Sequence, residues 1–312
     1  MKQFLKIIGL FGLLATSAAA AGPYAPAAGV EGTEAISLSD SRFVAWACGN
    51  WQPQYGTDVD STWKTPEKAW GAATGDAYDI VCLGNGGSIT LYFPNPICDG
   101  DGADFAVFEN GFSNNFLELG FVEVSSNGVD FVRFPTASLT ASAVGPFSIT
   151  GIDPTEIDGF AGKYRLGFGT PFDLSKLPDS EVLDKNHIRF VRIVDIIGDG
   201  GTTDSDGRPI YDPTPTTGSG GFDLEAIGVI HQNDGEFRIS QAELAGADFS
   251  LKWESNPGSS YRIERSDDLG TAGDEWIAVA TVNGETASGL TTMLVPRDGA
   301  LKRFWRVVRL EE

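Results

Sequence analysis

The sequence has few of the side chains that bind transition metals and few that carry positive charge. Two histidines and three cysteines occur in 312 residues, and 22 Lys and Arg stand against 43 Asp and Glu, a net charge of −21. So few histidines argue against a histidine-rich metal site. A surface this acidic repels phosphate backbones and anionic lipids, so we expect neither a nucleic-acid partner nor binding to membrane surfaces.

Long apolar runs are also lacking beyond the first residues. Ile7 to Leu14 is a short apolar run that follows two lysines and precedes Ala18-Ala19-Ala20. This layout is typical of a secretory signal peptide, and the run is too short to span a bilayer. We therefore expect residues 1–21 to be removed, and the mature chain to have no membrane span and to be secreted or held at the cell surface.

Sequence motifs of known catalytic sites are missing as well. There is no G-x-S-x-G elbow, no H-E-x-x-H and no glycine loop placed to bind phosphate. We therefore predict no catalytic residue and a protein that is not an enzyme. Cys48, Cys82 and Cys98 allow one disulfide with one thiol left over, and their spacing does not choose the pair.

The sequence is rich in strand patterns and in glycine. Alternating or compact apolar runs predict strands over 88–93, 104–109, 121–126, 129–134, 187–195 and 222–230. Asn127-Gly128 lies between two of these runs and predicts a tight hairpin. Helix signals are limited to short turns within 65–70 and 167–177. With 39 glycines, this pattern predicts an all-β fold.

A change of composition near residues 231–235 predicts two domains after the signal. Beyond it, strand patterns recur over 249–253, 261–265, 276–282 and 304–310. We predict a jelly-roll-type β-sandwich over residues 22–235 and a smaller immunoglobulin- or fibronectin-like β-sandwich over 236–312.

Acidic residues cluster in two separate stretches, where they predict a structural calcium. The first stretch lies on either side of the strand at 104–109. The second occupies the loop over 198–221, which has no strand or helix pattern, and the strand that follows this loop. Calcium takes six to eight oxygen ligands from flexible, glycine-containing carboxylate loops. Asp-Gly turns without a metal explain the same pattern. We expect the two stretches to meet around the ion, with ligands drawn from Asp99, Asp101, Asp104, Asp204, Asp206, Asp212 and Asp223.

Aromatic residues are concentrated between Trp46 and Trp70. Most should pack in the core, because a tryptophan side chain buries a large apolar area. We expect Trp51 and Tyr55 to be the exposed pair, whose rings would stack on a sugar.

Several of these segments resemble a family of uncharacterised bacterial cell-surface proteins, many of which carry a C-terminal sorting signal of the PEP-CTERM type. The resemblance lies in residues 83–91, 99–112, 121–128, 210–213 and 220–227. Residues 124–128 and 222–230 also resemble galactose-binding, discoidin-like jelly rolls, which implies a calcium near one end of the sandwich and ligand loops at the other. Residues 247–310 resemble a fibronectin type III module, which implies a spacer or attachment unit.

Three functions are consistent with these patterns. The first is an exported, calcium-stabilised binding or adhesion protein that recognises an extracellular glycan or surface polymer. The second is an extracellular polysaccharide-active enzyme that uses a pair of carboxylates. The third is a structural component of the cell surface or matrix.

Overall fold

The computed structural model consists of β-strands and four short 3-10 helices. It describes residues 22–50, 52–148, 150–233, 239–255, 259–267, 276–284, 290–296 and 303–310. The predicted signal peptide and Trp51 lie outside these ranges. Within them, none of the helices has the length and apolarity needed to span a membrane.

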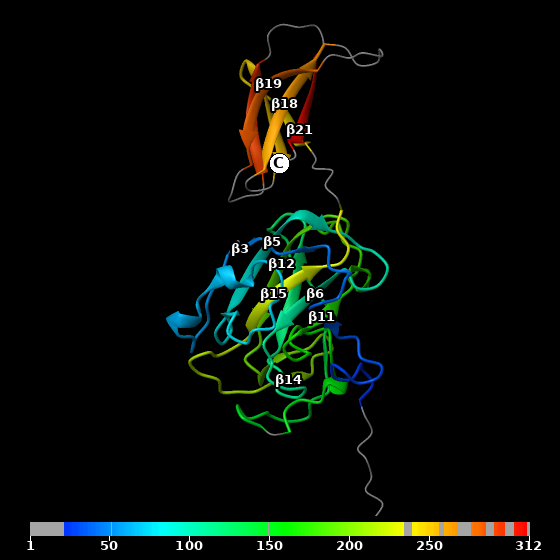
Figure 1. Cartoon of the computed structure of the whole chain (residues 1–312), viewed down its shortest axis with the longest axis vertical. Coiled ribbons are helices and arrows are strands. Elements are labelled where there is room, and N and C mark those ends of the chain that lie inside the picture. The colour runs from blue at the N-terminus through cyan, green and yellow to red at the C-terminus, as the bar shows by residue number, and fades with distance from the viewer. Residues whose placement is uncertain are drawn as a thin grey trace, which may run out of the picture.

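Two antiparallel sheets face each other in the larger part of the molecule (Figure 1). The first has the order β1 (Ile36–Ser37), β11 (Phe168–Phe172), β6 (Phe105–Glu109), β15 (Asp223–Val229) and β2 (Ala45–Trp46), with β4 (Val81–Cys82) also paired to β15. The second has the order β3 (Gly49–Asn50), β5 (Ser88–Ile97), β12 (Ile188–Asp195), β7 (Gly120–Ser125) and β8 (Val132–Arg133). The longer strands alternate between the sheets along the chain, which confirms the predicted all-β sandwich.

The main core lies between these sheets and draws on both. Ile89, Val122 and Ile193 extend from the second sheet, and they pack in one cluster with Val107 and Ile227 of the first. Side chains alternate across a strand, so every second residue of β5, β7 and β12 enters this core. The alternation of apolar residues in the sequence therefore accounts for the face-to-face packing of the two sheets.

Shorter elements connect the sheets. They are the helices η1 (Ser61–Trp63), η2 (Pro66–Ala69), η3 (Pro154–Glu156) and η4 (Leu174–Lys176), and the strand pairs β9 (Ala137–Ser138) with β10 (Ile157–Asp158) and β13 (Asp199–Thr203) with β14 (Pro209–Tyr211). Helix η2 begins at Pro66, as predicted. The segment 167–177 is only partly a helical turn, because its first half is strand β11.

We predicted no strand over residues 198–221, and this prediction is wrong, because β13 and β14 form a hairpin there. Asp, Gly and Thr residues hide the strand pattern, since Asp and Gly are depleted in strands. Tertiary packing decides instead. Ile210 is fully buried against Leu119 and Phe160 in a second apolar cluster.

The hairpin at Asn127-Gly128 is confirmed, but its turn is wider than predicted. Strand β7 pairs with β8 in the register Glu123 to Arg133, which leaves residues 126–131 in the turn. Gly128 has a positive φ of 75°. Asn127 contributes through its side chain, because its Oδ1 accepts the backbone N–H groups of Val129 and Asp130.

The strands after residue 238 pair only among themselves in the described residues. One sheet has the order β16 (Ile239–Ala245), β17 (Asp248–Glu254) and β20 (Leu290–Pro296), and the other has β19 (Ile277–Asn283), β18 (Ser260–Ser266) and β21 (Phe304–Leu310). Trp253, Tyr261 and Ile263 form the centre of their core. The boundary predicted near residue 235 falls within 234–238, outside the described residues.

We predict that Ile193→Ala lowers the free energy of unfolding by about 2–5 kcal/mol, because it leaves a cavity in the centre of the main core. Ile193 is fully buried on the central strand β12 and is paired with both β5 and β7. Val129→Ala is the control, since Val129 is 77% exposed, and it should stay within about 0.5 kcal/mol. Urea unfolding measures both, and equal losses would contradict this placement of the core.

Candidate functional site

Asp104 anchors the first acidic group. It is fully buried just before β6, and its carboxylate accepts the backbone N–H groups of Gly100 and Leu174, both at 2.7 Å. His231 Nδ1 lies 2.9 Å from the same carboxylate. Ligand atoms of Asp99, Asp104 and Asp173 all lie within 4.8 Å of one another. Two of the predicted calcium ligands therefore come together, and Asp173, which was not predicted, joins them.

The other predicted calcium ligands lie elsewhere. Asp101 is exposed. Arg208 is 2.7 Å from a carboxylate oxygen of Asp204 and 2.7 Å from one of Asp206, so both acids already have a cationic partner. Asp212 and Asp223 are buried in the interior. The seven acids do not share one site, and the loop 198–221 does not complete the group at Asp104.

A second acidic group is buried where β6 and β12 end and where β7 and β15 begin. It consists of Glu109, Glu118, Asp195, Asp212 and Asp223. The backbone holds these residues together, since Asp195 accepts the N–H of Phe222 and Asp212 accepts the N–H of Leu119. The charges that act most strongly on Glu118 are all negative. Here the two predicted acidic stretches do approach each other, at Glu109 and Asp223.

Burial dominates the electrostatics of this interior group. It raises the pKa of Asp195 and of Asp223 to about 6, and it raises the pKa of Glu109, Glu118 and Asp212 well above their ordinary values. Glu109 Oε1 and Asp223 Oδ1 have no hydrogen-bond partner among the described residues. Burial shifts all five carboxyls toward the protonated form, because a buried charge without a partner is costly.

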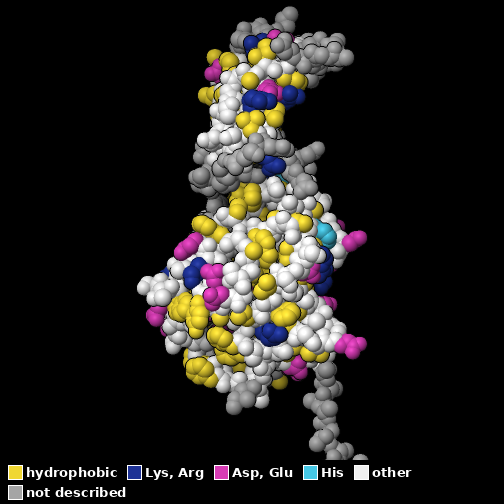
Figure 2. Space-filling model, in the orientation of Figure 1, with side chains coloured by type: hydrophobic (Ala, Val, Ile, Leu, Met, Phe, Trp, Pro, Cys, Tyr) yellow, Lys and Arg dark blue, Asp and Glu magenta, His cyan; other side chains and the backbone are white. Residues whose placement is uncertain are grey.

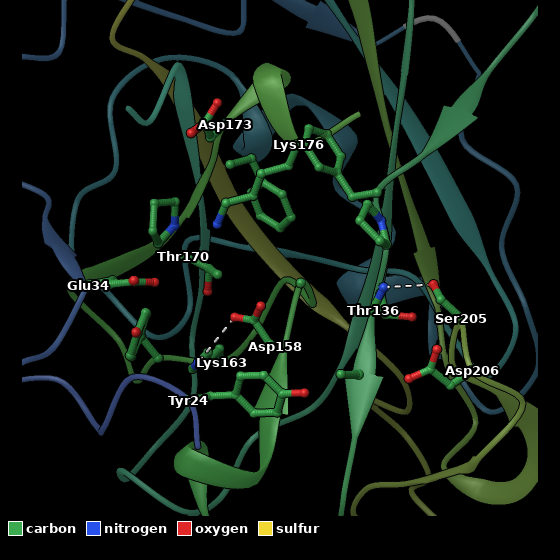
Figure 3. Close-up of a pocket in the computed structure, with 17 residues that line it drawn as sticks. Tyr24, Glu34, Thr136, Asp158, Lys163, Thr170, Asp173, Lys176, Ser205 and Asp206 are labelled. Atoms are coloured by element: carbon green, nitrogen blue, oxygen red, sulfur yellow. Dashed lines mark hydrogen bonds and ion pairs between the residues drawn. The ribbon is translucent and has the colours of Figure 1, made fainter. Parts of the chain in front are cut away.

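A pocket of about 240 Å³ lies apart from this acidic group, and none of the five acids lines it (Figure 3). Its walls come from six parts of the chain, which supply Tyr24, Glu34, residues 134–137, Asp158 with Gly159, Lys163 and Tyr164, residues 170–173 with Lys176, and Ser205 with Asp206. Figure 3 shows Lys163, Asp158 and Thr170 close together, with Ser205 and Asp206 across from them. Thr136 donates its N–H to Ser205 Oγ at 2.8 Å, which ties the hairpin β13–β14 to the pocket wall.

Lys163 is the most unusual residue of the pocket. Its side chain is 2% exposed, and its Nζ lies 3.6 Å from Asp158 Oδ1. Neither Lys163 Nζ nor Thr170 Oγ1 has a hydrogen-bond partner among the described residues. Burial lowers the pKa of Lys163, while the charges of Asp158 and Glu34 act in the opposite direction. A ligand with oxygen atoms at this point would satisfy both groups.

The sugar-stacking pair predicted from the sequence does not line this pocket. Trp51 lies outside the described residues, and Tyr55 is half-buried against the main core with its hydroxyl buried. Trp63 and Tyr78 stack instead, with ring centroids 6.3 Å apart, and Tyr78 is 70% exposed.

Neither a protein-family model nor a curated protein matches this sequence. The resemblance to cell-surface proteins therefore stays a prediction that rests on the residues quoted for it.

We predict that the protein is more stable near about pH 5 than near about pH 7.5 when chelator is present. Asp195 and Asp223 bind protons more tightly in the folded chain than in the unfolded one, because their pKa rises from 3.8 to about 6. Their contribution is fully present below the unfolded pKa, and it is lost as the pH rises through the folded pKa.

The melting midpoint at several pH values measures this effect. Asp223→Asn should flatten the profile, since it removes one of the titrating groups, and the exposed Asp101→Asn should leave it unchanged. A melting midpoint of the unmodified protein that is higher at about pH 7.5 than at about pH 5 would contradict the assignment.

Proposed function

We propose that this chain is an exported binding protein that holds a sugar unit of an extracellular glycan in the pocket at Lys163. The observation that carries the proposal is the pair of buried groups in the pocket wall, Lys163 Nζ and Thr170 Oγ1, that have no hydrogen-bond partner among the described residues. A fold keeps buried polar groups without partners only at a cost in stability, and such groups often mark a functional site. A hydroxyl-rich ligand supplies the missing acceptors.

The remaining lining has the composition that a sugar needs. Asp158, Glu34 and Asp206 offer carboxylate acceptors for sugar hydroxyls, and Lys163 and Thr170 offer donors. Phe134, Pro135, Pro171 and Phe172 offer apolar surface for the CH faces of the ring. A mostly apolar wall with a few converging polar groups is the usual form of a small-molecule site.

Binding is favoured over hydrolysis by the partners of the pocket carboxylates. The Asp158 carboxylate forms an ion pair with Lys163, with Oδ1 3.6 Å from Nζ. A glycosidase needs one carboxyl that stays protonated to donate to the leaving group. Carboxyls whose pKa burial raises well above its ordinary value, such as those of Glu109 and Glu118, are buried and do not line the pocket.

We also propose that calcium stabilises the fold at Asp99, Asp104 and Asp173. Three carboxylates within 4.8 Å suit a hard cation that prefers oxygen ligands. Asp104 accepts three hydrogen bonds, from Gly100, Leu174 and His231, and an ionised carboxylate has about four lone-pair sites, so it keeps one for an ion. Asp99 and Asp173 are half-exposed, which leaves room for water ligands.

We predict that Thr170→Val weakens glycan binding about tenfold, the effect of losing roughly one hydrogen bond to the ligand. It should not lower the melting midpoint, because the hydroxyl that it removes has no partner. Thr140→Val is the matched control, since Thr140 Oγ1 is also buried and unpartnered but does not line the pocket. A glycan array identifies the ligand, and calorimetry then compares the three proteins.

Two outcomes count against this proposal. If Thr170→Val binds the glycan as tightly as the unmodified protein, the pocket is not the site. If the array finds no glycan, or if a reducing-sugar assay detects release of sugar from the glycan that binds, the protein is not a simple glycan-binding module.

We predict that about 1 mM calcium raises the melting midpoint by several degrees relative to chelator, because an ion that binds only the folded state stabilises it. Asp173→Asn and Asp99→Asn should each reduce this shift. Asp101→Asn serves as the control, because Asp101 lies in the same acidic loop but is exposed and outside the group. Equal midpoints with calcium and with chelator would contradict the calcium site.

A further inference from the structure

A second pocket, of about 490 Å³, adjoins the pocket at Lys163. The two pockets share four lining residues, Glu34, Pro171, Asp173 and Lys176. The two pockets therefore adjoin at these four residues, and together they are called the groove. Beyond the shared wall, the second pocket is lined by Thr33, Ala35, Ile36, Arg42, Gly102 and Ala103.

Both pockets are built on the same pair of strands. Strand β1 pairs with β11, and the segment that leads into β1 supplies Glu34 to both pockets. Strand β11 supplies Pro171 to both pockets and Thr170 to the first alone. The groove therefore runs across the edge of the first sheet, from the hairpin β13–β14 toward Arg42.

From this arrangement we infer that the ligand is a chain of several sugar units that occupies both pockets, and not a single sugar. This inference rests on the proposed function, because it extends the same site. One pocket of about 240 Å³ encloses the first unit beside Lys163, and the larger, second pocket receives the units that follow it.

The charges of the groove indicate an uncharged chain. Four acids, Glu34, Asp158, Asp173 and Asp206, line it with three bases, Arg42, Lys163 and Lys176. Several of these are already engaged, since Lys163 lies 3.6 Å from Asp158 and Arg42 lies 2.8 Å from Asp40. Apart from the calcium proposed at Asp173, a polyanion would find few free cationic side chains here, and it would meet a chain whose net charge is −21.

The length of the ligand tests this inference. The probes are neutral oligosaccharides of one to six units in the glucose, galactose and mannose series, with uronic-acid oligomers of equal length beside them. We expect affinity to rise at least about tenfold from the monosaccharide to the trimer and then to level off, because contacts in the second pocket are added. The uronic-acid oligomers should bind more weakly than the neutral ones.

Filling the second pocket provides the matched variants. Ala35→Trp places a large ring in the second pocket and leaves the lining of the first unchanged. It should reduce the affinity for the trimer to that of the monosaccharide, with little change for the monosaccharide itself. Val30→Trp, at a position 47% exposed and outside both pockets, is the control. Ala35→Leu replaces Ala35→Trp if the larger ring lowers the melting midpoint.

The possible failures are distinguishable. Equal affinity for monosaccharide and trimer, or a trimer affinity that Ala35→Trp and Ala35→Leu leave unchanged, overturns the two-pocket groove while the pocket at Lys163 stands. Tighter binding of the uronic-acid series overturns the uncharged ligand. Binding of no oligosaccharide of any length overturns the proposed function and the groove with it.

Discussion

The burial of one ammonium group is the constraint on which the site depends. Lys163 is almost fully removed from solvent, and a buried charge must be paired or hydrogen-bonded. Its position follows from the preceding residue, because Gly162 has a φ of 79° and a Cβ there would lie 1.9 Å from the carbonyl oxygen of Glu118. Only glycine lets this segment approach β7 so closely. Lys163 follows Gly162 directly and lies beside Asp158 in the pocket, where its ammonium has no hydrogen-bond acceptor among the described residues.

The fold contains two kinds of unsatisfied polar group, and they indicate different chemistry. Lys163 and Thr170 are buried in the wall of a pocket that opens to the surface. Glu109 and Asp223 are enclosed between the sheet ends, so protons are the simplest partners for them. We therefore propose separate contributions for the two sets of acids: those near the pocket to ligand recognition, and those of the interior to the pH dependence of stability. Figure 2 shows that acidic side chains on one face of the molecule are scattered and not gathered into a single patch.

Most of the fold could be predicted from the sequence, and most of the site could not. The strands at 88–93 and 187–195 have clear alternation, which is a local property that survives folding. Asp99 and Asp104 were predicted to lie together because they are close in sequence, whereas Asp173 joins them only through the pairing of β11 with β6. Lys163 carried a weak signal, a single lysine in the apolar run 160–164, and nothing in that run shows that Asp158 and Thr170 will surround it. A site assembled from six segments that are distant in sequence depends on tertiary contacts that local patterns do not contain.

The crystal structure of the protein with its bound oligosaccharide tests the central claim most directly. Our account predicts that oxygen atoms of the sugar lie within hydrogen-bond distance of Lys163 Nζ and Thr170 Oγ1, with the chain continuing past Lys176. An oligosaccharide stacked on the exposed ring of Tyr78 beside Trp63, with the pocket at Lys163 holding no sugar, would contradict it.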